Sequence, residues 1–422
     1  MKLCLLTNTP SPHQLPFARE LAARLPAGDF VYLSTENVEK DRQRLGWSNV
    51  DERPEWLKVA VPWEQCVREA VQSDVLLTGF RDVELFRQRN ALKRHTFYMS
   101  ERWFKPPSGL MRLLHPRFLR LMLSFRRQAQ SPFFHYLPIG RFAAVDLRRF
   151  VPFANPEITW GYFVDVAARA ERVRPEGPGL TVLWCGRYLK AKRVDLLIEA
   201  VGMLVREGRK VRLLLVGMGS DEHRLRQLAG AVNKEAAVVN GPSASYKGAE
   251  PGEGGAAQRA LECVGKGGDP FVAEVNADAE APPVVFESPV AIAKVRQYMR
   301  RADVYVLPSS GYEGWGTVVN EAMAEGCAVV VSDAAGSGST LIRHGENGFL
   351  FKSGDVRALA KCLRSLADEP ALGERLGATA HDDMVELWTP AVAAERFLTF
   401  SKACADGAPL PVFKTGPLSH AL

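Results

Sequence analysis

Residues 304–354 constrain the fold more than any other stretch, because apolar runs, a glycine-rich turn and a helix follow one another there. The run 304–307 is apolar throughout and ends at a Pro-Ser-Ser sequence, which is typical of a strand buried on both faces. Glycines at 311, 314 and 316 then let bare backbone approach a ligand closely. We predict a helix from about Thr317 to Gly326, a residue type favoured just past a helix end, and a second strand over 328–331. The pattern indicates an α/β fold with a ligand site beyond the first strand.

The glycine-rich turn is suited to binding phosphate. Free backbone N–H groups and the positive end of the helix dipole point at the same place. Glu313 and Glu321 lie eight residues apart across this turn. Carboxylates repel phosphate, but an ionised carboxylate accepts hydrogen bonds from two sugar hydroxyls, so the pair predicts a site for a phosphorylated sugar. The alternative is that Glu321 only complements a helix N-terminus and that Glu313 is a solvated loop residue.

This stretch resembles the donor-binding motif of the retaining glycosyltransferases of family 4, which have the GT-B fold. The family pattern has two glutamates with seven residues between them, then A-M-A-x-G and later N-G. It is met by Glu313, Glu321, Ala322-Met323-Ala324, Gly326 and Asn347-Gly348. The resemblance is strong over most of residues 180–400 and weak over the N-terminal half. It implies two Rossmann-like domains with doubly wound parallel sheets that face a cleft.

Composition and length agree with such a protein. The 422 residues suffice for two domains, and 46% apolar with 24% charged residues is typical of a globular chain. The seven cysteines are dispersed without metal-ligand spacing, so we expect a reducing compartment, no metal site and no cofactor. The first residues are too polar for a secretory signal, and no run approaches the ~20 apolar residues of a membrane span. We therefore expect a cytoplasmic protein, with peripheral binding to the inner face of the membrane as an option.

The order of apolar runs and breakers predicts the domain organisation. We expect an N-terminal acceptor-binding domain over 1–170, a linker over 171–179 and a C-terminal nucleotide-sugar-binding domain over 180–385. Residues 231–283 shift to Gly, Ala, Glu and Lys and are expected to form a partly flexible insertion. A helix over 386–405 begins with Thr389 as N-cap and Pro390 in its first turn, and the resemblance implies that it crosses back onto the N-terminal domain. The tail 406–422 is expected to be disordered.

Two basic residues near the start of the second domain can bind a diphosphate. Arg187 follows a predicted strand and Lys192 comes five residues later, before a helix. The guanidinium can bind two oxygens while the ammonium acts as a point charge, although isolated basic residues are more often solvated. The resemblance assigns both to the diphosphate, with Arg193 standing where the family usually has glycine. The resemblance also implies that the donor is UDP- or GDP-linked. Its diphosphate then contacts the backbone of Gly316, Thr317 and Val318, and its sugar and ribose contact Glu313, Gly314, Trp315 and Glu321.

The acceptor side is marked by His13 and Glu101, which follow predicted strands and project toward the cleft. With Glu313, they are our candidates for the catalytic residues. The family often has a glycine pair where this chain has Pro12-His13, and a histidine where it has Ser100-Glu101-Arg102. A single histidine can equally be structural. No nucleophile for a double displacement is evident, so the resemblance implies same-face attack guided by the leaving phosphate, without a metal.

A basic and apolar segment over 102–127 predicts contact with an anionic membrane surface. Residues 102–145 hold eight basic and no acidic residues before Asp146, interspersed with leucine, methionine and phenylalanine. Such a helix can lie in a membrane interface. The alternative is an ordinary domain helix with an apolar inner face and arginines outside. Nothing else in the chain resembles a nucleic-acid-binding module.

These observations predict a retaining, metal-independent glycosyltransferase of the hexosyltransferase type. It would move a sugar from a nucleoside diphosphate sugar to a glycan or lipid-linked acceptor in the synthesis of cell-surface polysaccharide or glycolipid. The alternatives are a sugar-nucleotide epimerase on the same scaffold and an inactive nucleotide-sugar-binding protein. Dehydrogenase and P-loop chemistry are disfavoured, because Gly217-Met218-Gly219 lacks its third glycine at Glu222 and no G-K-[ST] sequence occurs.

Overall fold

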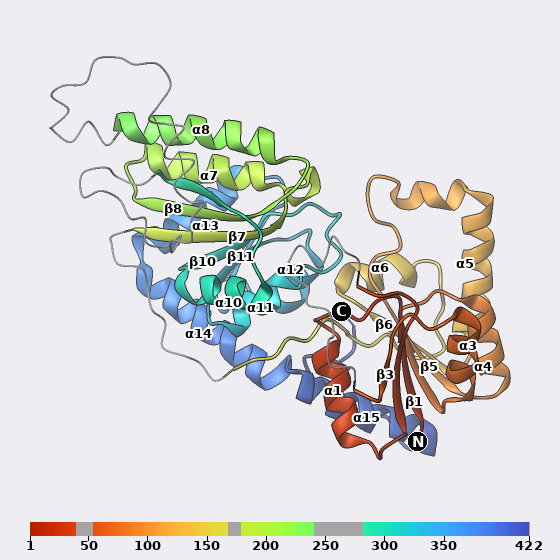
Figure 1. The fold of residues 1–422 in the computed structure, drawn as a ribbon. Helices are drawn as coiled ribbons and strands as arrows, with labels where there is room; N and C mark the ends of the chain where they lie inside the picture. Colours follow the sequence, from red (N-terminus) through yellow and green to blue (C-terminus); the bar gives the residue numbers. More distant parts are fainter. Residues whose placement is uncertain (39–53, 168–178, 240–281, 422) are drawn as a thin grey trace.

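The computed structural model describes residues 1–38, 54–167, 179–239 and 282–421, and its two halves are each built on a six-stranded parallel sheet (Figure 1). The first sheet has the order β3-β2-β1-β4-β5-β6. Its strands are β1 (Leu3–Thr7), β2 (Phe30–Ser34), β3 (Leu57–Lys58), β4 (Val75–Thr78), β5 (His95–Ser100) and β6 (Phe134–Pro138). The helices of this half are α1 (Leu15–Arg24), α3 (Trp63–Gln72), α4 (Val83–Ala91), η1 (Gly109–Leu114), α5 (Pro116–Ala129) and α6 (Arg141–Arg148).

The second sheet repeats this topology with the order β12-β11-β10-β7-β8-β9. Its strands are β7 (Leu180–Arg187), β8 (Val211–Met218), β9 (Val284–Glu287), β10 (Val304–Leu307), β11 (Ala328–Ser332) and β12 (Phe349–Phe351). The helices of this half are η2 (Lys190–Lys192), α7 (Val194–Arg206), α8 (Glu222–Val239), α10 (Ile292–Arg301), α11 (Val318–Ala324), α12 (Gly336–Leu341) and α13 (Val356–Asp368). Strands β10 and β11 are buried along their whole length, as expected for parallel strands covered on both faces.

Strand order reverses once in each sheet, next to the first strand of each half. In the first sheet β1 pairs with both β2 and β4, and in the second β7 pairs with both β8 and β10. The loops at the carboxyl ends of such neighbouring strands separate to opposite faces of the sheet, which leaves a crevice where ligands bind in folds of this type. The topology therefore places one such crevice in each half.

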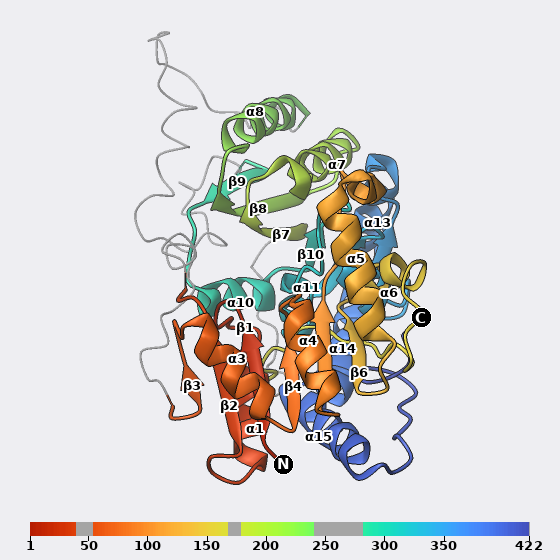
Figure 2. The ribbon, with the colours of Figure 1, turned by 90° about the vertical axis from the view of Figure 1, so that its right-hand side faces the viewer.

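Two C-terminal helices join the halves. α14 (Pro370–Leu387) packs on α11 and β11 of the second half, and α15 (Pro390–Asp406) packs on α1 and β5 of the first (Figures 1 and 2). The ring of Phe397 in α15 lies 5.0 Å from that of Phe97 in β5 and 6.1 Å from that of Phe17 in α1. One buried hydrophobic cluster contains side chains from both sheets, so the halves share a core.

Most of the predicted elements agree with the structure. The helix predicted to start at Pro390 is α15, where the Thr389 hydroxyl accepts a hydrogen bond from the Val392 amide at 3.2 Å. α1 likewise has Pro16 in its first turn. Both boundaries carried strong local signals: proline in the first turn of each and a side-chain cap on the second.

The expectation of a disordered tail was wrong, because Leu418 is 2% exposed and Ile158 pairs with His420 in an isolated bridge. Strand β3 ends at Lys58, and Ala60 two residues later takes a positive φ of 56°. Asp82 caps α4 by accepting a hydrogen bond from the Leu85 amide.

The expected insertion over 231–283 is helical at its start, because α8 continues to Val239. Residues 240–281 and most of the linker expected over 171–179 lie outside the described residues. No helix among the described residues is both long and apolar enough to cross a membrane.

Candidate functional site

Loops from both halves converge at the two crevices. His13 lies in the loop after β1, Arg187 is the last residue of β7, and Glu313 lies in the turn after β10. Contacts across the halves join these loops: His13 reaches Glu321 of α11, and the amide of Arg141 donates to the hydroxyl of Thr340 at 3.3 Å. The structure thus brings together most of the residues that the sequence singled out.

The glycine-rich turn is fixed by close backbone contacts. Gly316 has a φ of 90°, and a Cβ added there would lie 2.6 Å from the Leu307 side chain. A Cβ on Gly336, at the start of α12, would lie 2.2 Å from the carbonyl oxygen of Gly314. In the first turn of α11, which begins at Val318, the Val319 amide donates to the carbonyl of Gly316 at 3.0 Å. These contacts hold the turn in one fixed conformation at the start of the helix.

Lys192 and Glu313 are paired across this turn. The Lys192 ammonium lies 2.5 Å from Glu313 Oε2, which also accepts a hydrogen bond from the Ser309 hydroxyl at 3.0 Å. Arg187 is exposed, and its side chain has no hydrogen-bond or ion-pair partner among the described residues. The site therefore offers one neutralised cation and one unneutralised cation to an anionic ligand.

Arg193 stands where the family usually has glycine, and its backbone is nevertheless left-handed, with φ 51° and ψ 39°. Its side chain bonds Asp195 through Nε at 3.1 Å. The loop from Arg187 to Lys192 therefore keeps a backbone shape that glycine adopts easily, at a cost of roughly 1 kcal/mol for a non-glycine residue.

Glu321 and His13 form a buried contact between the halves. His13 Nδ1 lies 3.7 Å from Glu321 Oε1, and their side chains are 16% and 7% exposed. Burial raises the pKa of Glu321 to about 7, while Arg296 opposes the shift and Glu325 adds to it. Burial also lowers the pKa of His13 to about 4. Both groups are therefore held toward their neutral forms, and either can exchange a proton near neutral pH when its surroundings change.

Glu101 reaches from the first half to the glycine-rich turn. Its carboxylate accepts hydrogen bonds from Lys105 at 2.5 Å and from the Tyr162 hydroxyl at 3.3 Å. A Cβ on Gly314 would lie 1.8 Å from Glu101 Oε2, so the glycine leaves the space that this carboxylate fills. Glu101 therefore contacts the same turn that carries Glu313.

Trp315 is placed differently from our prediction of a donor contact. Its ring is 1% exposed, donates to Asn320 at 2.8 Å and lies 6.0 Å from the ring of Trp388. A Cβ on Gly161 would lie 2.8 Å from it. The side chain belongs to the core between the halves, and only its backbone borders the turn. Thr317 and Val318 lie at the start of α11 and are half-buried.

Sequence reasoning missed several residues of the site. Ser309, Lys105 and Tyr162 contact the two catalytic candidates Glu313 and Glu101. Ser337 is buried, its hydroxyl has no hydrogen-bond partner among the described residues, and it lies 3.3 Å from the position of a Cβ on Gly316. The glycines at 336 and 338 on either side of Ser337 were the available signal, since they allow the close approach of α12 to the turn.

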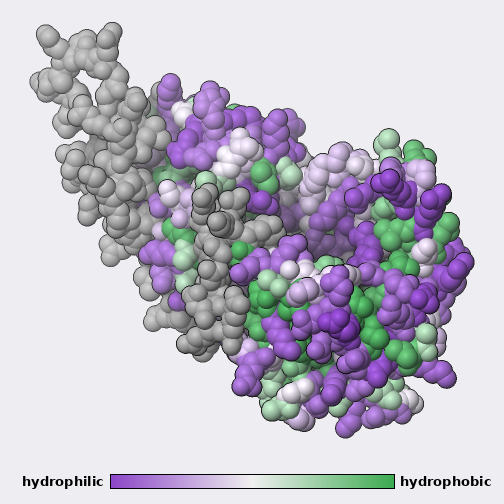
Figure 3. All heavy atoms as spheres, turned by 45° about the vertical axis from the view of Figure 1, so that its right-hand side comes forward, coloured by the Kyte–Doolittle hydropathy of each residue, from purple (hydrophilic) through white to green (hydrophobic). Residues whose placement is uncertain are grey.

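A separate surface combines apolar and basic side chains on η1 and α5. Met111, Leu114 and Leu123 are 70%, 80% and 57% exposed, and Arg112 of η1 and Arg117 and Arg120 of α5 lie between them in the sequence. Figure 3 shows apolar and hydrophilic side chains intermixed over this part of the molecule. The other face of α5 is buried, as the alternative interpretation of an ordinary domain helix requires, because Met122 and Phe125 lie in an aromatic cluster. The interpretation as an ordinary domain helix does not explain the exposed apolar residues on the outer face.

Three comparisons with known proteins relate the chain to glycosyltransferases. Residues 256–369 match the family model described as "Glycosyl transferases group 1". The D-inositol 3-phosphate glycosyltransferase of Streptomyces avermitilis is 32% identical over 51% of this chain and 38% of its own length. The phosphatidyl-myo-inositol mannosyltransferase of Mycobacterium leprae is 28% identical over 66% of this chain and 63% of its own length. The similarity thus spans less than two thirds of either relative.

Solved structures agree over nearly the whole chain. HepE of Anabaena, in complex with UDP, superposes with a TM-score of 0.61, covering 94% of this chain and 98% of its own at 14% identity. The sucrose-phosphate synthase of Thermosynechococcus elongatus gives 0.56, covering 97% and 100% at 15% identity. At these identities the comparison shows the fold alone.

The two parallel sheets, the crevices that face each other and the helices that cross between the halves define the GT-B fold. Part of the second half, residues 256–369, is similar to the glycosyl transferases of group 1, and the glutamate motif lies in that part.

Proposed function

We propose that the protein is a glycosyltransferase that moves a sugar, with retention, from a nucleoside diphosphate sugar to a glycan or lipid-linked acceptor. The observation that carries this proposal is the position of Lys192, Glu313 and Glu321 at one glycine-rich turn, with Arg187 at the end of β7, the first strand of the same half. Two cations and helix N–H groups suit a diphosphate, and two carboxylates suit sugar and ribose hydroxyls. The related glycosyltransferases and the fold support the same assignment.

The diphosphate gains negative charge as it leaves the sugar, and the site offers cations where that charge develops. The Arg187 side chain has no ion pair with a carboxylate that must break first, so it can bind two phosphate oxygens directly. Lys192 is held by Glu313, which positions its ammonium at the turn before the donor arrives. Together they supply the stabilisation that a divalent cation provides in other transferases, and we propose that the reaction is metal-independent.

The acceptor approaches, in this proposal, from the side of the first half. Glu101 and His13 border the turn from that side, and both are within reach of groups on the second half. We propose that Glu101 orients an acceptor hydroxyl and that His13 contacts the sugar or the acceptor. The attack then occurs on the same face as the departing phosphate, which takes the hydroxyl proton.

We further propose that the exposed surface of η1 and α5 binds an anionic membrane and so brings a lipid-linked acceptor to the cleft. Apolar side chains between arginines suit insertion into the headgroup region of such a membrane. The M. leprae relative acts on phosphatidyl-myo-inositol by its name, which makes inositol lipids and inositol 3-phosphate the first acceptors to screen.

The proposal is tested by measuring thermal unfolding with a panel of nucleoside diphosphates and their sugars. A ligand at ~100 times its dissociation constant adds about 2.7 kcal/mol to the free energy of unfolding. We expect one UDP- or GDP-based series to raise the unfolding temperature, and Arg187→Ala to abolish the rise. A folded protein that responds to no member of the panel would contradict the donor site. Donor binding without transfer to any acceptor would favour the inactive binding protein, and inversion of a donor hydroxyl would favour the epimerase.

A further inference from the structure

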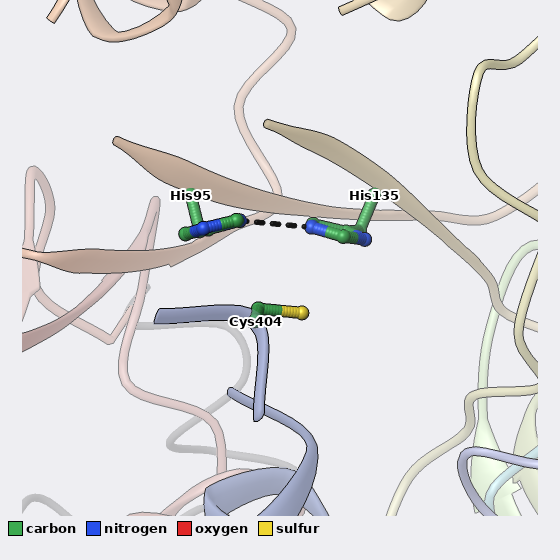
Figure 4. A group of neighbouring side chains, drawn as sticks. All are labelled: His95, His135 and Cys404. Carbon is green, nitrogen blue, oxygen red and sulfur yellow. Dashed lines mark hydrogen bonds between the residues drawn. The ribbon is translucent and has the colours of Figure 1, made fainter. Parts of the chain in front are cut away.

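His95, His135 and Cys404 meet at the edge of the first sheet that is opposite to the proposed active site. His95 is the first residue of β5 and His135 the second residue of β6, so both lie at the amino ends of their strands. Cys404 lies in the last turn of α15, which crosses this edge from the second half. Figure 4 shows the two imidazole rings side by side with Cys404 below them.

The register of the strands explains why these side chains meet. His135 pairs with Phe97 across β5 and β6, and their rings stack with centroids 4.5 Å apart. His95 lies two residues before Phe97 and therefore points to the same face of β5. That face is covered by α15, whose Phe400 ring lies 6.0 Å from His135. The two histidines and the cysteine are consequently held on the same layer between sheet and helix.

The distances fit a metal ion after a small adjustment. His95 Nδ1 and His135 Nε2 are 3.1 Å apart, and one ligand atom from each of the three residues lies within 4.8 Å of the others. Tetrahedral zinc with its usual bond lengths requires roughly 3.3 Å between two nitrogens and roughly 3.6 Å between nitrogen and sulfur. Rotation of the half-buried Cys404 side chain suffices for the change, because the nitrogens are already near their final separation.

The surroundings also resemble the outer shell of a metal site. The backbone of Cys404 forms a hydrogen bond with the His95 ring. Such a bond from the second ring nitrogen to a carbonyl is how proteins orient a ligating histidine. Ser401 precedes Cys404 by one helical turn, and its buried hydroxyl has no hydrogen-bond partner among the described residues. His95 and Cys404 are half-buried, so the cluster can be reached from solvent.

We propose that His95, His135 and Cys404 bind one zinc ion that fastens α15 to the β5–β6 edge of the first sheet. Two imidazoles and a thiolate match the ligand preference of zinc, and water completes a four-coordinate site. The ion takes no part in transfer, because this edge is opposite to the glycine-rich turn. Its role is to hold α15, the helix by which the second half packs on the first.

The test is to remove metal from the full-length protein by chelation, add zinc alone, dialyse and measure the zinc retained. We expect one zinc per chain and a higher unfolding temperature with zinc than without it. Cobalt added in place of zinc should give an absorption band from a cobalt–thiolate bond. Cys404→Ser should abolish that band and weaken zinc binding by more than about 10-fold. Loss of an outer-shell residue typically weakens metal binding about 10–100-fold, so loss of a ligand should exceed the lower end of this range.

Cys362→Ser is the matched control, because Cys362 is also a half-buried free cysteine on a helix but lies outside the cluster. It should retain zinc and the cobalt band. His135→Asn provides a second ligand variant, for which near-wild-type thermal unfolding without metal shows that the fold is intact. The proposal is overturned if the unmodified protein retains no zinc, or if Cys404→Ser retains as much zinc as Cys362→Ser.

Discussion

The two halves of the molecule have the same sheet topology but build their share of the site in different ways. In the second half, the proposed donor residues come from two short segments, 187–192 and 313–321, whose shape is fixed by local backbone. In the first half, His13 and Glu101 are single residues on separate loops, and their partners are Glu321 and Gly314 of the other half. The donor side is therefore a local structure, whereas the acceptor side is defined by contact between the halves.

This difference teaches that the halves should respond differently to mutation. A change at Arg187 should remove a ligand contact and leave the protein folded, because its side chain has no partner among the described residues to lose. Changes at His13, Glu101 or their partners should alter both the site and the fit of one half on the other.

The largest expected effect is that of Arg187→Ala on transfer. Loss of a group that stabilises developing charge typically lowers kcat about 10²–10³-fold, and we expect this range with the donor that the thermal panel identifies. The unfolding temperature without ligand should stay unchanged, because the side chain is exposed. Arg206→Ala is the control, since Arg206 is an exposed arginine of the same half bound only to exposed Glu235 among the described residues. Equal activity of the two variants would refute a local donor site.

The next largest effect concerns pH and the contact between His13 and Glu321. Glu321 has a raised pKa of about 7, so its contribution to stability is complete below about pH 4.5 and is lost as pH rises to 7. His13 has a lowered pKa of about 4, so its contribution is complete above about pH 6.5 and is lost as pH falls to 4. The two trends oppose one another in the unmodified protein, and each group can contribute a slope of at most about 1.4 kcal/mol per pH unit.

Removing either group should leave only the pH dependence of stability that the other group causes. Urea unfolding of Glu321→Gln is expected to show a free energy of unfolding that falls more steeply than in the parent as pH drops from 6.5 to 4. For His13→Asn it should fall more steeply as pH rises from 4.5 to 7. Curves parallel to that of the parent for both variants would mean that neither group is as buried in solution as the structure shows.

A smaller effect is expected at the point where Glu101 contacts the glycine-rich turn. Gly314→Ala places a methyl group on the Glu101 carboxylate, and overpacking of this kind costs roughly 1–3 kcal/mol. Glu101→Ala should remove most of that cost when the two changes are combined, which a double-mutant cycle of unfolding free energies measures. If the costs simply add, the two residues are not in contact and the acceptor side is more open than described.

The smallest effect is expected on the exposed surface of η1. Leu114→Ser removes an 80% exposed apolar side chain, and its insertion into a membrane is worth at least about 1.5 kcal/mol. We expect affinity for vesicles containing anionic lipid to fall about 10-fold, with donor binding in solution unchanged. Leu92→Ser, at a 55% exposed leucine at the end of α4, should have no effect on vesicle binding. Equal losses in the two variants would exclude a specific membrane-binding surface.

The sequence allowed prediction of the glycine-rich turn, the proposed donor side, because its signals are local. Glycines, a helix start and two carboxylates lie within the seventeen residues from Ser309 to Glu325 and determine backbone and chemistry together. The N-cap of α15 was readable for the same reason. What could not be predicted from local pattern is the position of a side chain whose partner is distant in sequence. Trp315 lies inside the donor motif, yet its ring packs on Gly161 and Trp388.

The same limit explains the ordered tail and the histidine–cysteine cluster. The tail is rich in proline and glycine, and its pairing with residues 157–159, which are distant in sequence, shows why it is ordered. His95, His135 and Cys404 have no motif spacing, because strand register and the crossing of α15 bring them together. In each case the deciding contact joins segments that the fold makes adjacent.

The shared core between the halves has a consequence for how the chain unfolds. One buried cluster contains Trp315, Trp388, Trp160 and Phe397. Neither half can therefore unfold without exposing aromatic surface of the other half. The two halves should then melt in a single calorimetric transition, and the amide hydrogens of their central strands should exchange with solvent through one common opening reaction. A nucleotide bound only to the second half would slow exchange in β1 and β4, strands that it never touches, by the full factor through which it stabilises the native state.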